Sequence, residues 1–135
     1  MPVTVHWDDE IQRTIVYVID GNWTWEEVFQ ARAQVNAWLD DMTRKAAFIF
    51  DTRTSNGRLP PNALASIRTL IEQAHPNAGP AVFVVNPKTF TRALMIDMLK
   101  LVGKLYRARW NFMFANSMEE ARALLRVRTA ENASV

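Results

Sequence analysis

The sequence predicts an α/β fold: a single, mostly parallel sheet of about five strands and four helices, in the order ββαβαβαβα. Three observations carry this prediction. The chain opens with two strand-like segments joined by a short turn, helical segments then alternate with strands, and the later strands are continuously apolar. A chain of 135 residues with 49% hydrophobic content fits one domain, 1–135, with 129–135 expected to fray.

The first two strands are predicted to pair as an antiparallel hairpin. Val3, Val5 and Trp7 alternate with polar residues, which is the two-residue period of a half-buried strand. A polar turn follows at 8–10, and the apolar segment 13–20 is predicted to form the second strand.

Capping boxes mark the start of the first and last helices. Thr24 and Glu27 stand three residues apart, as do Ser117 and Glu120, so each pair can satisfy free backbone N–H groups. After Thr24, apolar residues recur every three or four positions as far as Met42. We therefore expect an amphipathic helix between the hairpin and the rest of the sheet.

Three further strands are predicted, separated by two more helices. The strands are expected at Ala46–Asp51, Ala81–Asn86 and Trp110–Ala115. The helices are expected from Pro60 and Pro61 to Ala74, and from Pro87 to about Tyr106.

Composition excludes several kinds of chemistry. The chain has no cysteine, which removes disulfides, thiolate metal sites and a cysteine nucleophile. No apolar run is long enough to span a bilayer and the first residues do not resemble a signal peptide, so we expect a cytoplasmic protein. His6 and His75 have no metal-ligand or catalytic spacing and are interpreted as chance surface positions.

Charge is divided between the two parts of the chain. Residues 1–52 hold nine acidic and four basic residues, whereas residues 53–135 hold five acidic and twelve basic residues. This division favours head-to-tail association or an anionic partner. The basic residues are dispersed and carry no nucleic-acid recognition motif, so no nucleic-acid partner is expected.

Polar residues end three of the predicted strands and mark a candidate site. Asp51, Asn86 and Asn116 would share the carboxyl edge of a parallel sheet, where α/β domains bind ligands. The loop after Asp51 is a candidate contact for a partner or ligand through Asp51, Arg53, Thr54, Ser55 and Arg58. The alternatives are that the asparagines cap helices and that the loop is only solvated surface.

The predicted helix from Pro87 has a wider apolar face than a sheet needs to cover. Leu94, Met98, Leu101 and Leu105 lie on this face, and we interpret them as a candidate interface between two copies of the chain. The alternative is that the additional apolar surface packs within the monomer.

The element order, the strand Phe48–Asp51 and the helix start at Ser117 resemble those of STAS domains, in particular the SpoIIAA-like group. The resemblance covers roughly residues 4–125 and implies a regulatory domain that acts through protein association. Family antagonists carry a phosphorylated serine at the start of the helix after this strand. Leu59–Asn62 occupies that place here, so the usual phosphorylatable serine is missing.

The sequence therefore favours a non-enzymatic, STAS-like regulatory or protein-interaction domain, expected to be a homodimer with no cofactor and no metal. One alternative is a binding module for an apolar or anionic small molecule such as a lipid. A less favoured alternative is an enzyme that uses Asp51 with Arg53 or Arg58. These alternatives differ in whether the loop side chains converge in a concave pocket or spread into solvent.

Overall fold

A computed structural model describes residues 2–9, 13–56, 58–86 and 112–133 of the chain. In these ranges it has five strands: β1 (Val3–Trp7), β2 (Thr14–Ile19), β3 (Ala46–Asp51), β4 (Ala78–Val84) and β5 (Phe112–Ala115). The same ranges hold three helices: α1 (Trp25–Asp40), α2 (Ala63–Glu72) and α4 (Met118–Ala133).

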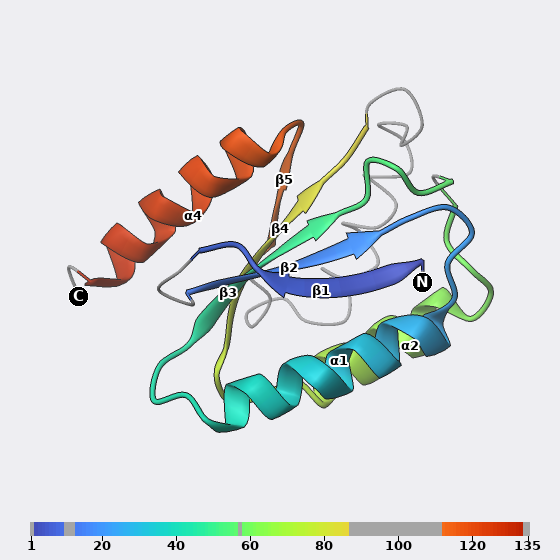
Figure 1. The fold of residues 1–135 in the computed structure, drawn as a ribbon, viewed down its shortest axis with the longest axis horizontal. Helices are drawn as coiled ribbons and strands as arrows, with labels where there is room; N and C mark the ends of the chain where they lie inside the picture. The colour runs from blue at the N-terminus through green and yellow to red at the C-terminus, as the bar shows by residue number, and fades with distance from the viewer. Residues whose placement is uncertain (1, 10–12, 57, 87–111, 134–135) are drawn as a thin grey trace.

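The strands form one mixed sheet in the order β1-β2-β3-β4-β5. β1 pairs with β2 antiparallel, and every later pair is parallel. Helices α1 and α2 lie side by side against one face of the sheet, and α4 lies on the other face (Figure 1). The α/β class, the opening hairpin and the five-stranded sheet are therefore confirmed.

Two apolar cores lie on opposite faces of the sheet because strand side chains alternate. Ile15, Tyr17 and Ile19 of β2 face α1 and α2, whereas Val16 faces α4. Ile15 and Val16 are almost completely buried, so the centre of the sheet is covered on both faces. This double cover explains why the parallel strands are continuously apolar in sequence.

The capping box of α1 forms as the sequence predicts, and that of α4 forms in part. The Thr24 hydroxyl oxygen accepts from the Glu27 backbone N–H at 3.3 Å, and the Glu27 carboxylate accepts from the Thr24 backbone N–H at 3.1 Å. At α4, the Ser117 hydroxyl oxygen accepts from the Glu120 backbone N–H at 3.1 Å. The Glu120 carboxylate reaches one residue further back, to the Asn116 N–H at 3.0 Å.

Strand β4 begins at Ala78, three residues before the predicted start. Its register against β3 shifts between the pairs Ala46–Ala78 and Phe48–Ala81, so two residues of β4, Gly79 and Pro80, stand opposite one residue of β3. Such a bulge accommodates a proline, which cannot donate to the strand ladder. A Cβ atom on Gly79 would lie 2.6 Å from the Ala46 carbonyl oxygen, so only glycine fits this close approach of the two strands.

The helices differ from the prediction in three places. Helix α2 begins at Ala63 rather than at the prolines, after Asn62 in a left-handed conformation with φ of 66°. Helix α4 continues to Ala133, which includes most of the segment 129–135 that the sequence predicted to fray. The predicted helix from Pro87 to about Tyr106 lies outside the described residues, so three helices are seen in the described part where the sequence predicted four.

None of the helices in the described part combines the length and the apolar character that crossing a membrane requires.

Candidate functional site

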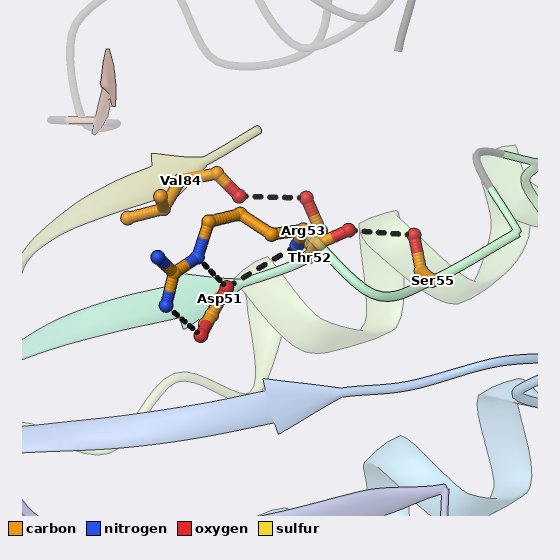
Figure 2. A network of polar contacts seen from close by, with 5 residues as sticks. All are labelled: Asp51, Thr52, Arg53, Ser55 and Val84. Carbon is orange, nitrogen blue, oxygen red and sulfur yellow. Dashed lines mark hydrogen bonds and ion pairs between the residues drawn. The ribbon is translucent and has the colours of Figure 1, made fainter. Parts of the chain in front are cut away.

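The carboxyl edge of the sheet, where the sequence predicted a site, is occupied by an ion pair within the loop. Arg53 binds Asp51 in a bidentate manner, with Nε–Oδ1 and Nη2–Oδ2 distances of 2.9 Å (Figure 2). The Arg53 backbone N–H also donates to Asp51 at 3.2 Å. These hydrogen bonds lower the pKa of Asp51, and the same pair raises the pKa of Arg53. The carboxylate of Asp51 and the guanidinium of Arg53 therefore pair with each other within the loop.

The next residues of the loop bind the neighbouring strands. The Thr52 hydroxyl donates to the Val84 carbonyl at 2.8 Å, and the Ser55 hydroxyl donates to the Thr52 carbonyl at 2.8 Å (Figure 2). Ser55 is buried, and it extends the parallel pairing by a bridge to Gly21. The Gly21 N–H in turn donates to the Thr54 carbonyl at 3.0 Å. This part of the loop therefore extends the sheet through its backbone, while Arg53 and Thr54 remain exposed.

The other predicted edge residues do not join Asp51 in a common pocket. Asn116 is exposed, and its backbone N–H belongs to the start of α4. Arg58 is exposed, and its N–H binds the Asn56 side chain at 2.9 Å. Asn86 is half-buried. The candidate interface residues Leu94, Met98, Leu101 and Leu105 lie outside the described residues.

A cavity of about 600 Å³ lies elsewhere, between α1, α2 and the sheet. We call it the α1–α2 cavity. Its apolar lining comes from α1, α2 and the strands, namely Val28, Val35, Leu39, Phe48, Phe50, Leu70, Ile71, Ala74, Ala78, Gly79, Pro80 and Ala81. Its polar lining is Tyr17, Arg32, Asn36, Lys45, Glu72 and His75. Neither Asp51, Arg53 nor Arg58 lines it, so the residues of the enzyme alternative do not converge here.

Stacked aromatic rings form part of the wall of the cavity on the sheet side. Tyr17 of β2 and Phe50 of β3 are partners in the strand register, and their rings stack with centroids 4.8 Å apart. Phe83 of β4 stacks on the other side of Phe50, again at 4.8 Å. Cross-strand aromatic stacking of this kind makes a flat and rigid surface, because each ring restricts the rotamers of its neighbours.

Tyr17 and Arg32 are two polar residues of this mainly apolar lining. Only 4% of Tyr17 is exposed, and burial raises the pKa of its hydroxyl well above the ordinary value. Arg32 is half-buried, and desolvation lowers the pKa of its guanidinium, although an arginine stays charged. The positive charge of Arg32 opposes the shift at Tyr17, so the two groups are close enough to interact electrostatically.

Polar contacts join the ends of α1 and α2 around the cavity. Arg32 donates to the carbonyl of Leu70 at 3.3 Å and to that of Gln73, both at the end of α2. His75 Nε2 lies 2.7 Å from an Asp40 carboxylate oxygen at the end of α1. Only 14% of the His75 side chain is exposed. The interpretation of His75 as a chance surface position is therefore wrong, because its largely buried side chain joins the segment after α2 to the end of α1.

The Asn77 side chain fixes the end of α1 in a similar way. Its amide donates to the Leu39 carbonyl at 3.0 Å and to the Met42 carbonyl at 2.9 Å. These carbonyls lie at and just beyond the C-terminus of α1, where backbone partners within the helix run out. The polar contacts hold the helices in place at their ends, while the space between them and the sheet stays partly open.

Two searches gave negative results. Across the described part of the chain, no three His, Asp or Glu side chains gather in a way that could hold a metal ion. Comparisons with protein-family models, curated proteins and solved structures found no significant match to the chain. The function must therefore be argued from the geometry of this molecule.

Two residues of the sequence gave a weak indication of the α1–α2 cavity. Arg32 interrupts the edge of an otherwise apolar helix stripe, between Val28 and Val35, and Tyr17 places a hydroxyl in an apolar strand. Either residue alone is ordinary in a core-facing position, because a long side chain can extend to the surface. The two groups come together only because β2 and α1 pack against each other in the folded protein.

Proposed function

We propose that this domain binds a small, largely apolar molecule in the α1–α2 cavity. The observation that carries the proposal is the cavity itself, with a volume of about 600 Å³ and a mainly apolar, partly aromatic lining. Sites for small molecules have volumes of roughly 300–1,000 Å³ and a lining of this kind with a few polar groups.

The α1–α2 cavity is partly open to solvent, whereas the core beside it is closely packed. Protein interiors are packed about as densely as organic crystals, and side chains around an empty volume lose contacts that they would otherwise make. Here the nearby residues Leu39 and Val35 are each only 1% exposed, so the surrounding core is well packed. A well-packed core that retains a large cavity supports a binding site rather than a loosely folded region.

The cavity also has an entrance. Lys45 and Glu72 line it and are exposed, so the cavity reaches the protein surface. A ligand could therefore enter without unfolding of the sheet.

Apolar contact alone would give only weak binding. A ligand that buries about 200 Å² of apolar surface gains about 5 kcal/mol at about 25 cal/mol per Å². Association costs at least about 4 kcal/mol in lost translational and rotational freedom. We therefore expect weak but saturable binding of an apolar probe, and tighter binding of a ligand that also meets the polar groups of the lining.

The test uses a neutral apolar probe, N-phenyl-1-naphthylamine, whose fluorescence rises in apolar surroundings. We expect saturable binding of one probe per chain. Replacement of Ala78 by leucine would fill part of the cavity and should weaken probe binding at least tenfold, whereas Ala65→Leu on the exposed face of α2 should leave it unchanged. Absence of saturable binding, or equal binding by Ala78→Leu, would overturn the proposal.

The STAS-like regulatory function is a second hypothesis that rests on the sequence resemblance. The mixed sheet with an antiparallel opening hairpin supports the α/β class but gives no support to the STAS assignment itself. The candidate dimer interface lies outside the described residues, and the site loop at Asp51–Arg58 contains no exposed serine, since Ser55 is buried. We therefore rank this function after ligand binding.

A further inference from the structure

We propose that the ligand of the α1–α2 cavity carries a carboxylate, which the Arg32 guanidinium and the Tyr17 hydroxyl hold together. This inference rests on the proposed function and adds the chemical class of the ligand. The hydrogen bonds and charges around these two residues support it.

The Tyr17 hydroxyl is a buried group that has no hydrogen-bond partner among the described residues. Tyr17 is 4% exposed and lines the cavity, and within the described residues no hydrogen bond involves its hydroxyl. Buried tyrosine hydroxyls usually have a hydrogen-bond partner. Because burial raises the pKa of Tyr17, the hydroxyl keeps its proton across the physiological range and can donate it in a hydrogen bond.

Arg32 supplies positive charge beside this hydroxyl. Its two contacts at the end of α2 are to neutral carbonyl oxygens, and no carboxylate pairs with it in the described part of the chain. The carbonyls at a helix C-terminus carry partial negative charge, which helps α1 to tolerate the half-buried cation. A guanidinium has five N–H donors, so Arg32 retains donors after these two contacts.

A carboxylate matches the two donors in both number and charge. One oxygen can accept from the tyrosine hydroxyl and the other from the guanidinium, and hydrogen bonds between charged groups are the strong ones. Exposed Lys45 adds a second positive charge to the lining, against the single carboxylate of Glu72, which is also exposed. A cationic ligand would face Arg32 directly, and a neutral alcohol would leave its charge uncompensated.

The ligand class that follows is a monocarboxylate with an apolar body. Its apolar part would lie against Phe50 and the apolar faces of α1 and α2, while its carboxylate meets Tyr17 and Arg32. A medium-chain fatty acid is the simplest member of this class, so decanoate is a suitable probe below the concentration at which it forms micelles.

The experiment measures displacement of N-phenyl-1-naphthylamine by decanoate, decanol and decylammonium at pH 7.4. We expect decanoate to displace the probe at a concentration at least tenfold below that of decanol, with decylammonium the weakest. In Arg32→Met the preference for decanoate over decanol should disappear, and in Tyr17→Phe decanoate should bind about three- to tenfold more weakly.

Controls separate loss of binding from loss of fold. Arg68→Met removes an exposed charge from α2 outside the cavity lining and should preserve the preference for decanoate. Arg32→Lys keeps the charge without the planar fork and should restore part of the preference. Thermal unfolding of each variant shows whether the fold is intact.

The outcomes distinguish this inference from the proposed function. If the neutral probe binds and Ala78→Leu blocks it, but decanoate and decanol compete equally, the carboxylate inference is wrong and the cavity is still a binding site. If the probe does not bind, both are wrong. If Arg32→Met keeps a full preference for decanoate, another group holds the carboxylate and the assignment to Arg32 fails.

Discussion

Replacement of Tyr17 by phenylalanine should make the ligand-free protein more stable. Tyr17 is 4% exposed, and its hydroxyl has no hydrogen bond in the described part of the chain. The hydroxyl therefore loses its bonds to water on folding and gains nothing in return, which costs roughly 1–3 kcal/mol. The aromatic ring would stay stacked on Phe50, since phenylalanine has the same ring.

The expected gain in stability follows from the cost of burying the Tyr17 hydroxyl. We expect the Tyr17→Phe variant to gain about 1 kcal/mol in the free energy of unfolding, because a neighbouring water in the partly open cavity recovers some of the loss. For a domain of this size, that corresponds to a rise of about 4 °C in Tm. Urea unfolding monitored by circular dichroism gives the first value, and calorimetry gives the second.

The difference in stability between wild type and Tyr17→Phe should grow at alkaline pH. In the unfolded chain Tyr17 ionises near its ordinary pKa of about 10, whereas burial raises the pKa in the folded state. Between these two pKa values the unfolded state has lost the proton and the folded state has kept it, so wild-type stability falls as pH rises. At pH 11 the loss relative to Tyr17→Phe is about 1.4 kcal/mol, while below about pH 9 this contribution is absent.

A bound ligand should make wild type more stable than Tyr17→Phe. If the hydroxyl donates to a bound carboxylate, saturating decanoate stabilises wild type more than Tyr17→Phe, because stabilisation grows with the ratio of ligand concentration to Kd. A ligand-free Tyr17→Phe protein that is less stable than wild type by 1 kcal/mol or more would refute the reasoning. That result would mean that the hydroxyl already has a partner in the folded protein.

Three other substitutions test the fold and the predicted interface. Gly79→Ala should destabilise by about 1–3 kcal/mol in urea unfolding, since its Cβ would lie 2.6 Å from the carbonyl oxygen of Ala46; unchanged stability would mean that the bulge adjusts freely. Asn77→Ala removes two hydrogen bonds at the end of α1 and should cost about 1–3 kcal/mol; a loss below 0.5 kcal/mol, roughly the lower limit for a single bond, would show that water replaces them. From the sequence, Met98→Asp with Leu101→Asp should convert a homodimer into a monomer in sedimentation experiments, and a wild type that is already monomeric at high concentration would contradict the interface hypothesis.

Local sequence signals predicted most of the fold. The capping box at Thr24 and Glu27 forms as predicted because its partners are three residues apart and need no tertiary contact. Strand β3 has the predicted bounds, Ala46–Asp51, because an apolar run that ends in a charged residue is a local pattern. The antiparallel hairpin and the parallel sheet then follow from element order and connection length.

Features that depend on pairing between distant segments could not be predicted in this way. Gly79 and Pro80 are ordinary strand breakers, and they lie inside β4 only because a bulge against β3 accommodates them. His75 has no chemical pattern around it in the sequence, yet it binds Asp40, which lies 35 positions earlier in the chain. Hydrogen bonds across such separations depend on how the helices are placed.

The predicted site at the carboxyl edge of the sheet also depended on contacts that the sequence pattern did not predict. The residues Asp51 and Arg53 have the side chains of a binding site and lie at the predicted edge of the sheet. Their proximity in sequence is what lets them bind each other instead, and hydrogen bonds along the loop complete the local structure. Charged residues close in sequence after a strand are therefore a poor guide to a site when one can bind the other.

The carboxyl edge of the sheet and the α1–α2 cavity differ in how completely their polar groups are satisfied. At the carboxyl edge, the ion pair of Asp51 with Arg53 leaves little for a ligand to add. In the α1–α2 cavity, Tyr17 and Arg32 lie in a mainly apolar lining, and among the described residues the Tyr17 hydroxyl has no hydrogen bond and Arg32 has no carboxylate partner. Groups left unsatisfied in a folded protein lower its stability, so a protein that keeps them gives up stability for interactions that form only when a ligand is present. For this reason we propose the cavity, rather than the edge of the sheet, as the place where this chain binds its ligand.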